Sequence, residues 1–179
     1  MEHVLNLFAC CPKCGSGHFY PSNEKAKRCE DCGFVYYINP SAAVVAFICN
    51  DKGELLVAVR AKEPAKGTLD MPGGFTDLNE TVEEAVAREV KEETNLDVTE
   101  MKYLFSLPNK YLYSGLVVPT MDLFFEVSVS DLSVLKAGDD VQNCMFISIK
   151  ELDPAKFGLS SISKGIGMYK EMKMFDLLK

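Results

Sequence analysis

Three glutamates with helical spacing are the residues of this sequence best suited to chemistry. Glu89, Glu92 and Glu93 stand at positions i, i+3 and i+4, so one face of a helix would carry all three carboxylates. Like charges at that spacing oppose a helix, and two of the three fall in its last turn, beside the negative end of the helix dipole. Segments that break a local rule in this way are usually functional. A hard divalent cation such as Mg²⁺ prefers carboxylate oxygens and would offset the repulsion.

The helix that carries these acids is well specified. Thr81, followed three residues later by Glu84, predicts a capping box at its start. Thr94-Asn95 predicts its end, because asparagine tolerates the left-handed conformation used after a last turn. Apolar residues recur at helical spacing and indicate a buried stripe on another face: Val82, Ala85, Val86 and Val90.

The segment 74–96 resembles the Nudix box, G-x5-E-x7-R-E-U-x-E-E-x-G-U, in which U is apolar. Eight of its nine constrained positions match: Gly74, Glu80, Arg88, Glu89, Val90, Glu92, Glu93 and Leu96. Asn95 replaces the remaining glycine, and asparagine is the next best residue for a positive φ. The alternative is an acidic, solvated helix face, but such a face would not need a glycine and an arginine at fixed offsets.

The resemblance implies a role for each matching residue. The carbonyl oxygen of Gly74 would bind Mg²⁺ or Mn²⁺ together with the three carboxylates, those of Glu89, Glu92 and Glu93. Arg88 would orient carboxylates rather than touch substrate. Its partner would be Glu80, which could instead be a more distant metal contact.

The general base varies among Nudix enzymes. Glu93 is the first candidate, and Asp139 and Asp140 on a later loop are alternatives that could equally be ordinary loop acids. Both histidines, His3 and His18, precede the predicted main domain, which excludes a histidine-activated nucleophile there. The lack of a histidine in the predicted main domain agrees with metal-assisted attack of water on a phosphate.

Two C-x2-C pairs with fourteen residues between them, Cys11/Cys14 and Cys29/Cys32, predict a zinc ribbon. Four thiolates complete a closed tetrahedral site, which is structural because no position is left for water or substrate. Cys10 could replace Cys11, although Cys11 gives both pairs the same spacing. The alternative of two disulfides requires a secreted protein, and the amino-terminal residues do not read as a signal peptide. We expect His18 at the surface rather than among the ligands.

The arrangement of elements predicts an α/β fold with a zinc ribbon over 1–38 and a Nudix domain over 39–179. Helices on both sides of a mixed sheet would form an α/β/α sandwich, which is also the Nudix fold. Cys49 and Cys144 lie in apolar, strand-like segments and are expected to be buried. Strands are expected over 42–48, 55–61, 68–71, 102–107, 111–113, 120–129 and 144–148, and a second helix over 160–179.

Composition limits the partners. The chain has 179 residues and a net charge of −7 with a pI of about 4.9, which argues against non-specific binding to nucleic acid or to membranes. No apolar run reaches the roughly 18 residues of a transmembrane helix. We therefore expect a cytoplasmic protein with a small-molecule nucleotide substrate, and a homodimer remains open.

The ribbon, the Tyr36–Pro40 linker and the box together resemble NADH pyrophosphatases and related ADP-ribose pyrophosphatases. The former carry S-Q-P-W-P-F-P-x-S after the box, whereas residues 106–113 read S-L-P-N-K-Y-L-Y and the chain has no tryptophan. ADP-ribose-like substrates are therefore favoured over NADH. Tyr111 and Tyr113 could stack on a base and Lys110 could meet a phosphate, although packing on the sheet would explain the tyrosines equally well.

We therefore expect metal-dependent hydrolysis of the pyrophosphate bond of a nucleoside diphosphate linked to another moiety, such as ADP-ribose or NADH. Mg²⁺ or Mn²⁺ would be the catalytic cofactor and Zn²⁺ a structural one. The alternatives are a pyrophosphohydrolase of (oxidised) nucleoside triphosphates and a non-catalytic nucleotide sensor. Intact carboxylates argue against the sensor, because binding alone would not need them.

Overall fold

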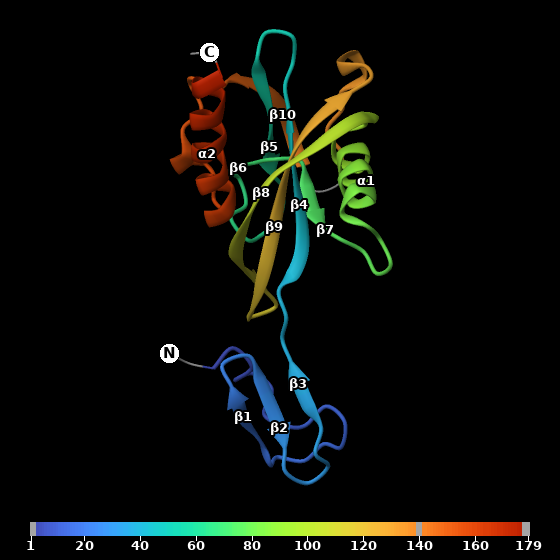
Figure 1. The fold of residues 1–179 in the computed structure, drawn as a ribbon, viewed down its shortest axis with the longest axis vertical. Coiled ribbons are helices and arrows are strands. Elements are labelled where there is room, and N and C mark those ends of the chain that lie inside the picture. Colours follow the sequence, from blue (N-terminus) through green and yellow to red (C-terminus); the bar gives the residue numbers. More distant parts are fainter. Residues whose placement is uncertain (1–2, 139–140, 177–179) are drawn as a thin grey trace. The chain divides into compact units, whose positions relative to one another are not determined.

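The computed structural model describes residues 3–138 and 141–176, which form two compact units (Figure 1). One unit comprises the residues up to Pro40 together with Tyr111–Pro119, and the other comprises Ser41–Lys110 together with the residues from Thr120 onward. The assignment of 1–38 and 39–179 to separate domains stays a prediction. No helix among the described residues is long and apolar enough to cross a membrane.

The first unit contains a three-stranded antiparallel sheet in the order β1-β2-β3. Its own core is small, with Cys11, Phe19 and Cys29 as the buried members. Lys27 is buried beside it, and its Nζ donates to the carbonyl oxygen of Phe8 at 2.6 Å. So few buried side chains do not hold a domain together without a further crosslink. The strands are β1 (Phe19–Asn23), β2 (Ala26–Cys29) and β3 (Val35–Tyr37).

The second unit is built on a four-stranded mixed sheet in the order β7-β4-β9-β8. Strand β4 is antiparallel to β7 and parallel to β9. It is an almost continuous apolar run, which is typical of a strand covered on both faces. The strands are β4 (Ser41–Ile48), β7 (Gly73–Phe75), β8 (Val98–Tyr113) and β9 (Leu116–Val129).

A second sheet, in the order β10-β5-β6, is antiparallel throughout. It contains β5 (Glu54–Arg60), β6 (Leu69–Asp70) and β10 (Val141–Ser148). The prediction of two strands over 102–107 and 111–113 is wrong, because both belong to the single strand β8. Pro108 lies between them without interrupting the strand, since β8 is at the edge of its sheet, where a missing N–H is tolerated.

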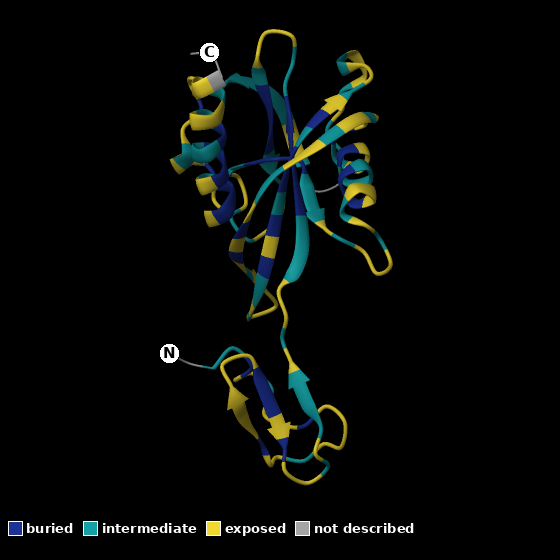
Figure 2. Cartoon of the chain, in the orientation of Figure 1, coloured by how far each residue is buried: buried dark blue, intermediate teal, exposed yellow. Residues whose placement is uncertain are grey.

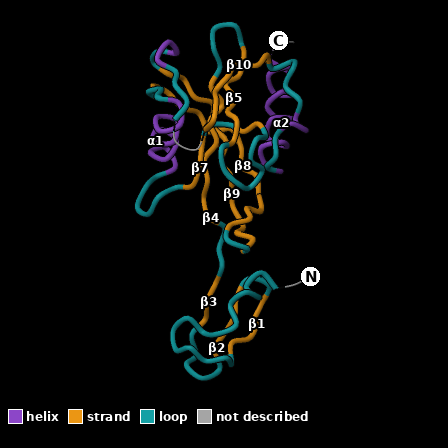
Figure 3. Tube along the Cα trace, turned by 180° about the vertical axis from the view of Figure 1, so that it is seen from behind, coloured by secondary structure: helices purple, strands orange, loops and turns teal. Residues whose placement is uncertain are grey.

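Two helices cover opposite faces of these strands (Figures 1 and 3). Helix α1 (Val82–Thr94) and helix α2 (Ser160–Asp176) each turn a buried stripe toward the sheet (Figure 2). Residues 177–179 of the predicted second helix lie outside the described residues. Two short 3-10 turns complete the unit, η1 (Leu132–Val134) and η2 (Pro154–Lys156).

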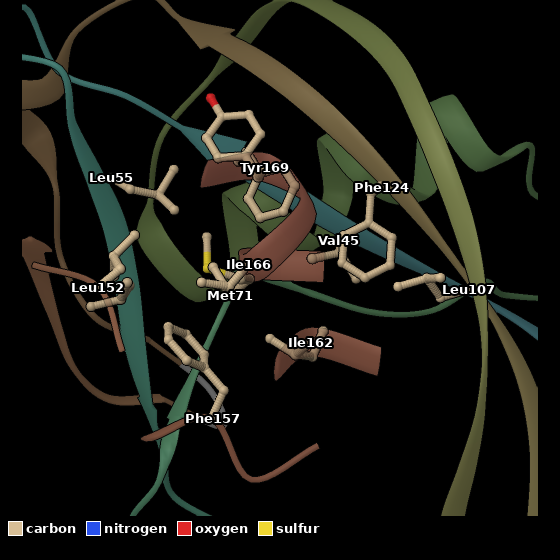
Figure 4. Close-up of a cluster of buried hydrophobic side chains, with 12 residues drawn as sticks. Val45, Leu55, Met71, Leu107, Phe124, Leu152, Phe157, Ile162, Ile166 and Tyr169 are labelled. Carbon is tan, nitrogen blue, oxygen red and sulfur yellow. The ribbon is translucent and has the colours of Figure 1, made fainter. Parts of the chain in front are cut away.

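The core is divided between the two faces by the alternation along β4. Val45 and Phe47 point into the cluster under α2, which is drawn in Figure 4, whereas Val44, Ala46 and Ile48 point into the cluster under α1. This period of two is what a strand packed on both faces requires. The predicted α/β/α sandwich with a mixed sheet is confirmed.

Cys49 and Cys144 are only partly buried, so the prediction of full burial is wrong for both. Cys49 packs against the cluster under α2, and Cys144 packs against the cluster under α1. Cys49 stands directly after the last residue of β4, and Cys144 lies within β10, opposite Ala58 of β5. Their apolar sequence surroundings could not show this position.

Candidate functional site

Helix α1 begins and ends where its capping residues predict. The Thr81 hydroxyl accepts from the backbone N–H of Glu84 at 3.2 Å, and the Glu84 carboxylate accepts from the N–H of Thr81 at 2.8 Å. Asn95 has φ 60°, and its N–H closes the last turn on the carbonyl of Lys91. The apolar stripe faces the core, so the acidic face is free to turn toward β7.

Two glutamates of α1 lie against two consecutive glycines of β7. The N–H of Gly73 donates to Oε2 of Glu93 at 3.0 Å. Gly74 lies so close to Glu89 that a Cβ on Gly74 would be 2.5 Å from Oε1 of that carboxylate. The missing side chain of Gly74 therefore leaves the space in which the Glu89 carboxylate lies, whereas Gly73 contacts Glu93 through its N–H. The sequence analysis had not assigned Gly73 a role.

Arg88 is the centre of the polar contacts on this face of the helix. Its Nε and Nη2 bind the Glu80 carboxylate at 2.7 and 2.9 Å, and Nη1 donates to Glu89 at 2.8 Å and to Glu92 at 3.1 Å. Nη2 also donates to the carbonyl oxygen of Phe75 at 3.0 Å, which ties the helix to β7. The sequence alone assigns the compensation of like charges to a bound cation, whereas in the structure Arg88 supplies part of it.

The carboxylates around Arg88 differ in electrostatic environment. Hydrogen bonds from Arg88 and from the N–H of Asp77 lower the pKa of Glu80 to about 2. Burial raises the pKa of Glu89 above its usual value, against the opposing effect of Arg88. Among the three glutamates that Arg88 contacts, Glu92 is the most open, with 48% of its side chain exposed. Glu80 is thus committed to the arginine, whereas Glu89 and Glu92 keep oxygen atoms for another partner.

A later loop covers the end of the same helix. Gly138 donates its N–H to the carbonyl of Glu93 at 3.0 Å, and Lys136 donates to the carbonyl of Thr94 at 3.0 Å. A Cβ on Gly138 would lie 2.5 Å from the carbonyl oxygen of Glu92. Asp139 and Asp140, the alternative general bases, lie outside the described residues. Gly138 was not recognised from the sequence, and its position just before two aspartates was the available signal.

The donor set of this site fits a hard divalent cation. It consists of carboxylates on one helix face, beside a strand that presents backbone rather than side chains. Mg²⁺ and Mn²⁺ prefer oxygen ligands of this kind. Such an arrangement can bind a cation next to a phosphate and hold a carboxylate where it can accept a proton from water.

The predicted substrate-binding residues lie on β8. Tyr111 and Tyr113 are at its end, and Tyr113 is 66% exposed. They belong to the unit that contains the ribbon, whereas the carboxylates belong to the other unit, whose first segment ends at Lys110. The predicted contacts of these residues with substrate stay predictions.

The four cysteines of the two C-x2-C pairs come together in the first unit. Their Sγ atoms all lie within 4.8 Å of one another. Cys11 and Cys32 are 3.7 Å apart and Cys14 and Cys29 are 3.6 Å apart, which matches the roughly 3.8 Å edge of a tetrahedron of thiolates around zinc. The group contains Cys11, whereas Cys10 is exposed.

The two cysteine pairs adopt the same backbone conformation. The glycine after each pair has a positive φ, 76° for Gly15 and 71° for Gly33, and donates to the carbonyl of the first cysteine. Backbone N–H groups of Cys32 and Asp31 lower the pKa of the Cys29 thiol to about 7, whereas, against a backbone hydrogen bond from Ser16, the neighbouring thiols raise the pKa of Cys14 to about 12. Without a metal, the four clustered sulfurs therefore share few negative charges. His18 is exposed and pairs with Asp31, as expected for a surface histidine.

The family of the chain follows from its sequence and its fold together. The family model described as the NUDIX domain matches residues 39–164. Of the box residues in that region, Gly74 lies on β7, Glu80 lies in the loop before α1, and Arg88, Glu89, Val90, Glu92 and Glu93 lie on α1. The chain therefore belongs to the Nudix hydrolase family.

Two curated relatives resemble the chain in sequence. The ADP-ribose pyrophosphatase of Methanocaldococcus jannaschii is 36% identical over 132 residues, which cover 72% of this chain and 73% of that protein. The NAD-capped RNA hydrolase NudC of Vibrio atlanticus is 33% identical over 106 residues, 59% of this chain. The match spans only 39% of the length of that NudC.

Solved structures share the fold. A Nudix hydrolase from Nitrosomonas europaea superposes with a TM-score of 0.68 at 21% identity, covering 93% of this chain and 92% of the other. The Nudix domain of Shewanella oneidensis NrtR, solved with ADP ribose, has a TM-score of 0.59 at 18% identity and covers 76% and 90%. At these identities the likeness concerns the fold.

Proposed function

We propose that this chain hydrolyses the pyrophosphate bond of a nucleoside diphosphate linked to a second group, with ADP-ribose as the first candidate, and that it requires Mg²⁺ or Mn²⁺. The observation that carries the proposal is the placement of Glu89 and Glu93 of α1 against the bare backbone of Gly74 and Gly73. The M. jannaschii relative, named an ADP-ribose pyrophosphatase and matched over 73% of its length, supports the substrate class.

The residues divide the work in the following way. Glu89, Glu92 and Glu93, with the carbonyl oxygen of Gly74, would hold the cation. When bound, the cation neutralises phosphate oxygens and makes a coordinated water more acidic. Glu93 accepts the proton of the attacking water, and the N–H of Gly73, which donates to its Oε2, keeps that carboxylate oriented. Arg88 keeps Glu89 and Glu92 in position and does not itself touch the substrate.

The products identify the bond that is broken. Addition of water across the pyrophosphate of ADP-ribose gives AMP and ribose 5-phosphate, and NADH gives AMP and the reduced mononucleotide. A nucleoside triphosphate would instead release pyrophosphate. We rank ADP-ribose above NADH because the tryptophan-containing segment of the NADH enzymes has no counterpart here.

A substrate panel with two matched variants tests the proposal. ADP-ribose, NADH and a nucleoside triphosphate are incubated with Mg²⁺ or Mn²⁺ and the products are separated by chromatography. Glu93→Gln should lower turnover by about 10²–10⁴-fold, the usual contribution of a general base. Glu83→Gln makes the same change on an exposed glutamate in the first turn of the same helix and should keep the parent rate. Hydrolysis of the triphosphate alone would favour the alternative substrate class, and an unchanged rate in Glu93→Gln would refute the assignment of the base.

We further propose that Cys11, Cys14, Cys29 and Cys32 bind one structural Zn²⁺. The S–S separations and the matching backbone of the two pairs support this site. With only three buried residues in its hydrophobic cluster, two of them cysteines of the site itself, the ribbon would depend on the metal to fold.

A further inference from the structure

A cavity of about 530 Å³ lies at the carboxyl end of α2, with none of the carboxylates of α1 among its described lining residues. Its walls come from three segments: the turn between β4 and β5, the residues that follow β10, and the last turns of α2. The volume is within the range of small-molecule sites. The catalytic proposal above makes no use of this cavity.

The charge of the cavity is opposite to that of the chain. Three lysines line it, Lys52, Lys150 and Lys173, and no acidic residue is among the described lining residues. The chain as a whole has 26 acidic and 19 basic residues, so three lysines around one cavity are unexpected. Glu126 pairs with Lys173 from outside the lining and offsets one of these charges. The remaining excess is positive.

One of these lysines, Lys173, is held in place by a glutamate that a buried tyrosine supports. Tyr169 is 1% exposed, and its ring stacks on Phe47 at 4.2 Å between centroids. Figure 4 shows its hydroxyl pointing away from the apolar cluster. That hydroxyl donates to Glu126 at 2.9 Å, and Glu126 binds Lys173. Lys173 is therefore oriented before any ligand arrives, which reduces the conformational entropy lost on binding.

The remaining lining described here is partly apolar. Ile149 and Met174 line the cavity together with the half-buried thiol of Cys49. Lysine is a common phosphate binder through its point charge, and apolar walls favour a ligand that is larger than a bare anion. We propose that this cavity binds a small organic phosphate whose phosphate group meets the lysines and whose body packs on Ile149 and Met174. The inference does not depend on the proposed hydrolase activity.

Binding without divalent cations separates this cavity from the carboxylate site, because unneutralised carboxylates repel a phosphate. AMP is titrated into protein labelled with ¹³C at its methionine methyl groups, in buffer without added divalent cations. The Met174 signal, identified with Met174→Leu, should shift on addition of AMP. The double variant Lys52→Gln/Lys150→Gln should bind at least about tenfold more weakly, which corresponds to about 1.4 kcal/mol. The control is Lys164→Gln, which changes an exposed lysine of α2 that does not line the cavity; this variant should bind AMP with the affinity of the parent.

Three results would overturn the inference. The first is a Met174 signal that does not move by about 10 mM AMP, a concentration that would detect even millimolar affinity. The second is equal affinity of the double variant and Lys164→Gln, with unfolding temperatures that show both to be folded. The third is an equal affinity for inorganic phosphate, because the apolar walls would then contribute nothing.

Discussion

Alanine at Gly73 should lower the stability of the fold, whereas alanine at Gly74 should lower the affinity for a divalent cation, although the two residues are neighbours on β7. Gly73 has φ 149°, and a Cβ there would lie 2.0 Å from the carbonyl oxygen of Val44 in the central strand β4. Neither the dihedral angle nor the backbone of β4 can adapt easily. The dihedral strain is about 1–3 kcal/mol and the overpacking about 1–3 kcal/mol, so Gly73→Ala should lower the free energy of unfolding by about 2–6 kcal/mol.

At Gly74 the clash is with a side chain instead. A Cβ would lie 2.5 Å from Oε1 and 2.7 Å from the carboxyl carbon of Glu89, and that carboxylate can rotate away. The rotation would weaken its 2.8 Å bond to Arg88 and remove it from the metal position. Gly74→Ala should therefore change stability by no more than about 1 kcal/mol. Its affinity for Mn²⁺ should fall by about 10–100-fold, the usual effect of a misplaced support around a metal.

Calorimetry tests the predicted loss of stability in Gly73→Ala, and metal titration tests the predicted loss of affinity in Gly74→Ala. In the absence of divalent cations, Gly73→Ala should melt at least about 4 °C below the parent, because 1 kcal/mol corresponds to about 2–4 °C at this chain length. Mn²⁺ titration followed by electron paramagnetic resonance reports the second effect. Gly167→Ala is the control, since a Cβ there meets nothing within 4 Å and the residue lies inside α2. If Gly73→Ala melts with the parent, or Gly74→Ala binds Mn²⁺ as the parent does, the assignment of the two glycines is wrong.

Three further predictions concern the supporting residues. Glu80→Gln should melt at a lower temperature than the parent at neutral pH. Because the pKa of Glu80 is lowered from 4.5 to about 2, the difference between the two melting temperatures should narrow as the pH falls from 4.5 to 2. A difference that does not change with pH would contradict the pairing with Arg88. Cys29→Ser should lose its zinc, measured by mass spectrometry, while the unit containing α1 keeps its melting transition; retained stoichiometric zinc would exclude the four-cysteine site. Asn95→Ala should lower the melting temperature, and Asn95→Gly should lower it less, because φ is 60° at this position and glycine adopts a positive φ without strain. Equal melting temperatures of the two variants would show that the end of α1 does not depend on this conformation.

Much of the candidate site could be predicted from the sequence because the relevant signals are local. The capping box at Thr81 and Glu84 and the left-handed Asn95 involve residues at most four apart, so their chemistry alone places the ends of α1. The shared face of the acids follows from helix geometry in the same way. Equally spaced cysteine pairs predicted a cluster that the structure brings together.

The parts that could not be predicted depend on contacts between distant segments. The bond from Gly73 to Glu93 joins residues twenty positions apart and exists only because β7 pairs with β4 in one register. The cover that Gly138 forms over the end of α1 is likewise a tertiary contact. The continuity of β8 through Pro108 required knowledge that this strand is at an edge.

The position of Arg88 shows how the helix can carry this charge before a cation is bound. One guanidinium contacts Glu80, Glu89 and Glu92, so the like charges are partly offset within the fold itself. Two of its nitrogens are used on Glu80, which lies outside the i, i+3, i+4 set and shares its carboxylate with the N–H of Asp77. The compensation is therefore incomplete for the acids that face β7. A fully paired cluster would have little reason to bind a cation, whereas one guanidinium among three glutamates leaves negative charge that a bound cation would offset.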